Sequence, residues 1–312
     1  MEEWELIIIG AGPAGLTAGI YAGRRELKTL ILEEKIPGGA AADSPLIENY
    51  PGFRSIGGRE LMNKMFEHCK SFGVQIRELE GVTELDLKNR QESKLVKTTK
   101  SVYSAKAVII ATGSHHRELG VPGEKEFRGR GVSYCATCDG PFFKNKRVVV
   151  VGGGNTAAIS ALFLADIASE VRLVHRREQL RAEEALFREL QSKGVKFFWN
   201  SIVKEIKGEN LVKSVVIHNQ TTGESFEIET DGVFINIGEE PNSEIAKAAG
   251  VQVDERGYII VDSRQRTNIP GVYAAGDVTN CPIKQIGVAV GQGMIAAEEA
   301  YGYIRRPYYY RE

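Results

Sequence analysis

Two glycine-rich loops constrain the fold of this 312-residue chain more than any other feature. The first runs from Gly10 to Gly15 and follows the apolar run Leu6–Ile9. A helical stretch from about Ala14 to Arg25 then leads to an expected strand over Thr29–Leu32. A strand, a tight turn, a helix and a second strand in this order form the βαβ unit of dinucleotide-binding domains. The segment therefore predicts a Rossmann-like domain.

The same pattern recurs in the middle of the chain. The segments expected are a strand over Arg147–Val151, a loop over Gly152–Ala157, a helix from about Thr156 to Ile167 and a strand from about Val171 to Val174. In each unit the first glycine of the loop lies 23 residues before the residue that closes the second strand. These pairs are Gly10 and Glu33 in the first unit, and Gly152 and His175 in the second. We therefore expect an α/β protein with two Rossmann-like, three-layer dinucleotide-binding domains.

The second unit is expected to be inserted into the first domain. Further strand-like runs end in glycine turns, and these are Ala107–Ile110, Gly232–Ile237 and Gly271–Ala274. The segments 82–104 and 202–230 alternate and carry turn signals, which predicts small antiparallel sheets. The resulting boundaries give a discontinuous domain of residues 1–115 and 246–312, and an inserted domain of residues 116–245.

Composition excludes several classes of protein. The formal net charge of −1 does not favour nucleic-acid or membrane-surface binding, and four cysteines are too few for a disulfide-stapled secreted scaffold. No segment is apolar enough to span a membrane, and the acidic amino terminus lacks the features of a signal peptide. We expect a cytoplasmic protein with no nucleic-acid partner, no membrane partner and no metal site.

The first loop is suited to a pyrophosphate. Gly10 permits the tight turn, Gly12 lets the backbone approach the phosphates, and Gly15 lets helix and strand pack closely. Pro13 and Ala14 open the expected helix. Glu33, which is followed by Glu34, can accept hydrogen bonds from ribose hydroxyls, which favours FAD or NAD over a 2′-phosphate. The alternative is a glycine-rich turn of an unrelated α/β protein.

The second loop differs at the residue that selects the nucleotide. His175 stands where Glu33 stands in the first unit, and Arg176, Arg177 and Arg181 follow it. Guanidinium groups bind a 2′-phosphate with fork-like geometry, so the cluster predicts NADPH. The loop residues expected to contact this nucleotide are Gly152, Gly154, Asn155, Thr156 and Ala157. The alternative is a solvated basic surface.

Cys135 and Cys138 form a dithiol pair between the two loops. Two cysteines at this spacing can close a small disulfide, and the carboxyl of Asp139 beside them could exchange protons with the dithiol or a reduced flavin. Half of a zinc site is an alternative that would need a second ligand pair, and Cys69 and Cys281 are solitary. Two inert buried cysteines are the other alternative. Near the carboxyl terminus, Asp277 could bind a flavin ribityl chain or cap the next helix.

These motifs together resemble the low-molecular-weight thioredoxin reductases of bacteria and archaea over nearly the whole chain. The resemblance also includes the segment from Glu48 to Gly52. It implies FAD in the discontinuous domain, NADPH in the inserted one, a homodimer, and thioredoxin or a thioredoxin-like protein as the disulfide partner. It implies that Cys138 faces the flavin, that Cys135 attacks the partner disulfide, and that Asp139 is the acid. Its further cofactor-binding residues are Gly39, Asn49, Ala111, Thr112, Gly113, Gly276, Asp277, Lys284 and Gln285.

The chain departs from the family pattern at a few positions. Ala40 replaces a glutamine near the flavin, Ile159 and Ser160 replace two glutamates, and Lys284 replaces an arginine. A ferredoxin-dependent flavin thioredoxin reductase, a small-molecule dithiol oxidase and a non-catalytic dinucleotide-binding redox sensor are the alternatives. Because the dithiol and the second loop share one domain, we expect that domain to swing about its two crossovers.

Overall fold

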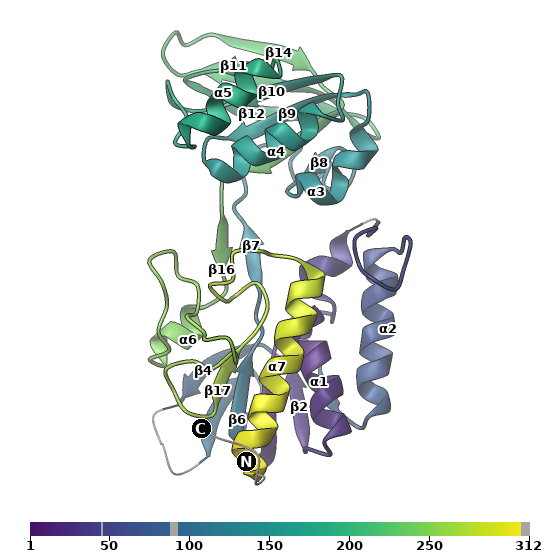
Figure 1. The fold of residues 1–312 in the computed structure, drawn as a ribbon, viewed down its shortest axis with the longest axis vertical. Helices are drawn as coiled ribbons and strands as arrows, with labels where there is room; N and C mark the ends of the chain where they lie inside the picture. Colours follow the sequence, from purple (N-terminus) through teal and green to yellow (C-terminus); the bar gives the residue numbers. More distant parts are fainter. Residues whose placement is uncertain (45, 88–92, 307–312) are drawn as a thin grey trace. The chain divides into compact units, whose positions relative to one another are not determined.

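The computed structural model describes residues 1–44, 46–87 and 93–306 (Figure 1). The chain divides into two compact units, one made of residues 1–115 together with the chain from residue 240 onward, and one of residues 116–239. The chain passes from the first unit to the second between residues 115 and 116 and returns between residues 239 and 240. At these crossings β7 (Ser114–His116) pairs with β16 (Glu239–Pro241) in a two-stranded sheet. The second unit is thus an insertion in the first.

The first unit is built on a mostly parallel sheet. Its strand order is β3-β2-β1-β6-β5-β4, and β17 pairs with β6. The strands are β1 (Glu2–Ile9), β2 (Thr29–Leu32), β3 (Gln75–Arg77), β4 (Val82–Asp86), β5 (Lys94–Thr98), β6 (Val102–Ile110) and β17 (Val272–Ala274). β4 and β5 are antiparallel and extend this sheet through β6, so the segment 82–104 does not form the separate small sheet that its alternation predicted. Residues 88–92 of that segment lie outside the described residues.

Both faces of this sheet are covered. The helices α1 (Pro13–Arg24), α2 (Gly58–Ser71) and α7 (Ile286–Arg305) lie along one face (Figure 1). Leu6 and Ile8 of β1 are in the hydrophobic cluster with these helices, whereas Ile7 and Ile9 are in the cluster on the opposite face. Because successive strand side chains point to opposite faces, a sheet that is buried on both sides needs the continuous apolar run seen here. The helix α6 (Glu244–Ala248) contributes to the second cluster.

The second unit has three layers. Its central sheet, in the order β11-β10-β9-β15-β8, is parallel throughout. The strands are β8 (Val132–Ser133), β9 (Arg147–Gly152), β10 (Glu170–Val174), β11 (Lys196–Phe198) and β15 (Gly232–Asn236). The helices α4 (Asn155–Ala165) and α5 (Glu184–Ser192) pack on the face of Val148 and Val150. The antiparallel sheet of β12 (Ser201–Gly208), β13 (Val212–Asn219) and β14 (Ser225–Glu229) contributes to the cluster on the other face.

Three short helical turns complete the elements. They are η1 (Gly39–Asp43) in the first unit, and α3 (Ala136–Asp139) and η2 (Gly140–Phe143) in the second. Across the described ranges, no helix is both long enough and apolar enough to cross a membrane.

Candidate functional site

The first glycine loop lies between β1 and α1. A Cβ on Gly10 would lie 2.4 Å from the carbonyl oxygen of Ala111, and one on Gly15 would lie 1.9 Å from the carbonyl oxygen of Gly10. These two glycines therefore permit close backbone packing. Gly12 has a different environment, because the only described atom within 4 Å of its added Cβ would be the Cα of Gly39, at 3.9 Å. No described side chain caps α1, so its first N–H groups and the open side of Gly12 fit a pyrophosphate.

Glu33 holds its carboxylate against this loop. Its Oε2 accepts a hydrogen bond from the backbone N–H of Ala11 at 2.7 Å, and its Oε1 accepts one from the N–H of Lys35 at 2.8 Å. The carboxylate therefore has a fixed position at the end of β2, where it can also accept from ribose hydroxyls. Glu34 is exposed, and its side chain lies close to Gly81, where an added Cβ would be 3.1 Å from the Cγ of Glu34.

The structure brings together predicted residues that are far apart in sequence. The Nδ2 of Asn49 donates to the Oε1 of Gln285 at 3.0 Å. Asn242, which the sequence analysis missed, holds the loop of Ala111, Thr112 and Gly113. Its Nδ2 donates to the carbonyl of Thr112 at 2.8 Å, its carbonyl accepts from the Thr112 hydroxyl at 2.6 Å, and its N–H donates to the carbonyl of Gly113 at 3.0 Å. No local motif marks Asn242, because its partners lie about 130 residues earlier.

The last glycine turn is fixed by a second residue that the sequence did not reveal. The backbone N–H of Gly276 donates to the Oε1 of Gln292 in α7 at 2.8 Å, and Gly276 has a φ of 81°. Asp277 is half-buried beside it. Lys284 donates from its Nζ to the carbonyls of Asp277 at 3.0 Å and Thr279 at 2.6 Å. The ammonium group of Lys284 therefore stabilises the loop that carries Asp277.

In the second glycine loop, as in the first, one glycine permits close backbone packing and another leaves open space. Gly152 has a φ of 155°, and an added Cβ would lie 2.3 Å from the carbonyl oxygen of Asn236. A Cβ on Gly154 would meet no described atom within 4 Å. Gly154 is the N-cap of α4 and no side chain of the described residues caps that helix, which places Asn155, Thr156 and Ala157 in its first turn. The open side of Gly154 fits a second pyrophosphate.

A basic cluster follows β10. The side chains of Arg176, Arg177 and Arg181 are exposed, and none of the three forms an ion pair with a carboxylate in the described part of the chain. His175 is only 5% exposed, and a Cβ on Gly153 would lie 2.1 Å from its ring. Burial lowers the pKa of His175, and the charges of Arg177, Arg181 and Arg176 lower this pKa further. The neutral ring thus packs against the loop, and the three guanidinium groups are available to an anion.

Cys135 and Cys138 are joined by a disulfide. Cys135 precedes α3, and its Sγ accepts a hydrogen bond from the backbone N–H of Cys138 at 3.2 Å. Asp139 ends this short helix, and its Oδ2 accepts from the hydroxyl of Ser133 at 2.6 Å. The same Ser133 oxygen accepts from the N–H of Cys135 at 3.1 Å. Ser133, which the sequence analysis missed, therefore connects the carboxyl of Asp139 to the backbone of Cys135.

Burial makes Asp139 a stronger candidate for an acid. Its Oδ1 is buried and has no hydrogen-bond partner among the residues that the structure describes. Burial raises the pKa of the Asp139 carboxyl, and the Ser133 hydrogen bond offsets part of that rise. A protonated carboxyl beside a disulfide can supply a proton to a departing thiolate.

The other two cysteines are separate from this site. Cys69 is fully buried, and burial raises the pKa of its thiol to about 12. A thiol with such a pKa stays protonated at neutral pH and is unreactive, which fits a packing role for Cys69. Cys281 is half-buried and free. Among the described residues, no group of three or more His, Cys, Asp or Glu side chains is arranged to hold a metal ion.

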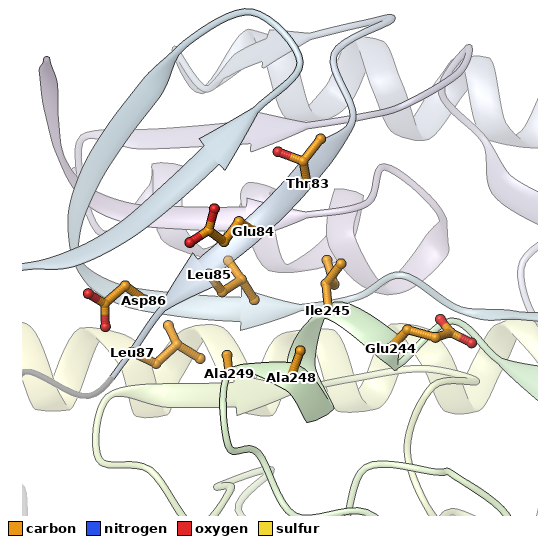
Figure 2. Close-up of a pocket in the computed structure, with 9 residues that line it drawn as sticks. All are labelled: Thr83, Glu84, Leu85, Asp86, Leu87, Glu244, Ile245, Ala248 and Ala249. Carbon is orange, nitrogen blue, oxygen red and sulfur yellow. The ribbon is translucent and has the colours of Figure 1, made fainter.

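A groove of about 640 Å³ lies in the first unit between β4 and α6 (Figure 2). Its apolar wall consists of Leu85, Leu87, Ile245, Ala248 and Ala249. None of the loop, dithiol or basic-cluster residues lines it, so the groove is distinct from the predicted nucleotide sites.

Comparison with known proteins agrees with this architecture. The family model of the pyridine nucleotide-disulphide oxidoreductases matches residues 4–293, so the protein is a member of that family. The chain is 48% identical over 303 residues to the thioredoxin reductase of Bacillus subtilis, covering 96% of this chain and 95% of that one. It superposes on the crystal structure of thioredoxin reductase from Streptococcus pyogenes with a TM-score of 0.92, at 43% identity and with 98% and 99% of the two chains covered.

A more distant match is the Ferredoxin-Flavin Thioredoxin Reductase from Clostridium acetobutylicum, at 34% identity and a TM-score of 0.54, with 98% of this chain and 100% of that chain covered. The matched proteins of Bacillus subtilis and Streptococcus pyogenes are both thioredoxin reductases, and within its family the chain belongs with them. The expected fold and family are confirmed.

Proposed function

We propose that this protein is an NADPH-dependent thioredoxin-disulfide reductase, with FAD in the discontinuous domain and NADPH in the inserted one. The observation that carries the proposal is the Cys135–Cys138 disulfide beside the half-buried Asp139, in the same unit as a glycine loop and a cluster of three exposed arginines. A redox-active disulfide explains why a carboxyl of raised pKa lies next to it. Neither inert cysteines nor half of a zinc site would need one.

The first unit is proposed to hold FAD. The open side of Gly12, the uncapped start of α1 and the fixed carboxylate of Glu33 support a pyrophosphate and its ribose there. Asp277 and the paired amides of Asn49 and Gln285 supply polar groups for the rest of the cofactor. When bound, FAD would accept a hydride from the nicotinamide and pass two electrons to the disulfide.

The second unit is proposed to prefer NADPH over NADH. Arg176, Arg177 and Arg181 offer exposed guanidinium groups beside a loop whose Gly154 is open to a pyrophosphate. Because none of them has a carboxylate partner among the described residues, an incoming 2′-phosphate would displace no ion pair there. This charge arrangement favours NADPH over ferredoxin as the electron donor.

The two sulfurs are proposed to have different roles. The Cys135 thiolate would attack one sulfur of the partner disulfide, so that a mixed disulfide forms and one partner thiolate leaves. The Cys138 thiolate would then attack the Cys135 sulfur, which restores the internal disulfide and releases the second partner thiolate. Asp139 would hold the proton that these thiolates exchange.

The direct test is NADPH-dependent reduction of thioredoxin by purified protein reconstituted with FAD. We expect turnover by the wild type and complete loss in Cys135→Ser, in which NADPH still reduces the flavin. Cys281→Ser is the matched control, since it makes the same substitution at a cysteine that is outside the disulfide, and it should retain wild-type turnover. Loss of flavin reduction in Cys135→Ser would contradict the assigned order of electron transfer. Turnover without Cys135 would contradict its role.

The resemblance also supports a homodimer and a cytoplasmic location, which stay proposals. Light scattering of the purified protein should give twice the mass of one chain, and a monomeric mass would contradict the dimer.

A further inference from the structure

We propose that Glu183 is a positioning residue for recognition of the 2′-phosphate, because it clamps the arginine segment 176–181 to the second glycine loop. The inference rests on the proposed preference for NADPH and adds a residue outside the arginine cluster to it. Glu183 itself carries the wrong charge to bind a phosphate. Its contribution comes from the geometry that it imposes.

The clamp is a reciprocal pair of hydrogen bonds. Asn155 is the first residue of α4, directly after the open Gly154, and Glu183 is the N-cap residue of α5. The Nδ2 of Asn155 donates to the Oε1 of Glu183 at 3.0 Å, and the backbone N–H of Glu183 donates to the Oδ1 of Asn155 at 3.0 Å. The pair ties the start of one helix to the start of the next.

Two further contacts fix the same segment. The backbone N–H of Arg181 donates to the carbonyl of Gly153 at 2.7 Å. At the other end of the segment, the buried ring of His175 packs against Gly153. The chain between His175 and Glu183 is thus attached to the glycine loop at both ends, and the three arginines lie on the stretch between these attachments.

The clamp counteracts the repulsion between the three arginines. Arg176, Arg177 and Arg181 are all close enough to His175 to lower its pKa, so three like charges share a small volume without carboxylate partners in the described chain. Their mutual repulsion favours a segment that opens away from the loop. Recognition of a phosphate requires the guanidinium groups to be held in place before the ligand arrives, since ordering them on binding would cost affinity. The Asn155–Glu183 pair supplies that order.

The negative charge of Glu183 allows a test in which the two explanations predict opposite changes in the affinity for a 2′-phosphate. If the carboxylate acted only through its charge, removing it would strengthen binding of a 2′-phosphate, because a negative group near the arginines would be gone. If it acts as a clamp, removing it weakens that binding. Glu183→Gln keeps an acceptor for the Asn155 amide and removes the charge. Glu184→Ala is the matched control, because it removes the same charge from the next residue, whose carboxylate pairs with Arg188 at 3.4 Å.

The experiment is isothermal titration of NADP⁺ and of NAD⁺ into the FAD-reconstituted oxidised protein, with melting temperatures measured in parallel. The inference predicts that Glu183→Ala weakens NADP⁺ binding about fivefold, the equivalent of roughly one hydrogen bond, and leaves NAD⁺ binding within about twofold. Glu183→Gln and Glu184→Ala should bind NADP⁺ as the wild type does or more tightly. The melting temperature of Glu183→Ala should match that of Glu184→Ala.

Three results would overturn the inference. Unchanged or tighter NADP⁺ binding by Glu183→Ala would reduce Glu183 to a surface charge. Equal weakening of NADP⁺ and NAD⁺ would make it a general support of the glycine loop. A wild-type protein that does not discriminate between the two nucleotides would refute the proposed preference itself, and the clamp with it.

Discussion

The carboxyl of Asp139 has one oxygen bonded to Ser133 and the other buried without a partner in the described chain. Burial disfavours the ionised form and raises the pKa of the Asp139 carboxyl above its usual value, and the Ser133 hydrogen bond offsets part of that rise. A residue of this kind costs stability at neutral pH. Its position next to the disulfide is consistent with a role in proton transfer.

Replacement of Asp139 should separate its chemical role from its structural one. We expect Asp139→Asn to slow thioredoxin reduction by about a hundredfold or more, the usual range for loss of a general acid. NADPH should reduce the flavin in this variant at the wild-type rate, since that step does not use the carboxyl. Stopped-flow absorbance with each substrate in turn would measure the two steps. An unchanged rate of thioredoxin reduction across pH would remove the assigned role.

The raised pKa also predicts how stability depends on pH. Between the ordinary carboxyl pKa of 3.8 and its higher value in the fold, the native state binds more protons at Asp139 than the unfolded state does. The contribution of Asp139 to the free energy of unfolding is therefore fully present below pH 3.8 and falls as pH rises through that window. Urea unfolding of the wild type and Asp139→Asn at a series of pH values would measure it. The difference in stability should shift toward the variant with rising pH, and a difference that is independent of pH would contradict the assigned protonation.

At the scale of elements, each strand-loop-helix unit uses its glycines for two purposes. Gly10, Gly15 and Gly152 permit backbone contacts that a Cβ would block, whereas Gly154 leaves open space in front of a helix N-terminus. The first group supports the fold. Gly154 is suited to a ligand.

This division predicts that Gly154→Ala folds normally and binds nucleotide poorly. Its φ of −98° and ψ of −179° are accessible to alanine, and the added methyl meets no described protein atom within 4 Å. We expect an unchanged melting temperature and NADPH affinity lowered by at least about tenfold, because the methyl group occupies the path of the pyrophosphate. Gly152→Ala is the contrast variant, in which the added Cβ would lie 2.3 Å from the carbonyl oxygen of Asn236 and should lower the melting temperature. Wild-type affinity in Gly154→Ala would show that the nucleotide binds elsewhere.

The arginine segment makes a second prediction at this scale. Replacing Arg176 and Arg177 with alanine should weaken NADPH binding by roughly 1.5–3 kcal/mol for each charge-assisted hydrogen bond to the 2′-phosphate that the variant no longer forms. NADH lacks the 2′-phosphate, so its binding should hardly change. Kinetic measurement of KM for both nucleotides gives the comparison. Equal effects on the two would mean that the cluster does not read the phosphate.

At the scale of the whole molecule, regular patterns were predictable and long-range partners were not. The spacing from glycine loop to second strand predicted both Rossmann-like units, and the adjacency of Cys135, Cys138 and Asp139 predicted the dithiol site. Asn242 and Gln292 escaped prediction because their hydrogen bonds join segments that no local pattern connects. Ser133 lies only two residues before Cys135, but serine is common in loops, and only its hydrogen bond to Asp139 in the structure connects it to the candidate site. The hairpin of β4 and β5 was placed in a separate sheet because alternation shows that strands exist without showing which strand they pair with.

The insertion also determines which groups move together. The dithiol and the second glycine loop both belong to the unit of residues 116–239, and the two chain crossings pair with each other through β7 and β16. We expect this unit to move as one body about those strands during turnover, so that the disulfide and the nicotinamide reach the flavin in turn.

Anaerobic titration of the FAD-reconstituted protein with NADPH, followed by its visible spectrum, tests the electron path most directly. One NADPH supplies two electrons, and the flavin and the disulfide accept two each, so the wild type should consume about two equivalents before the oxidised-flavin band is lost. The Cys135→Ser, Cys138→Ser double variant should consume about one. A flavin band that NADPH cannot bleach, although dithionite bleaches it, or an equal consumption by the two proteins, would contradict transfer from NADPH through the flavin to this disulfide.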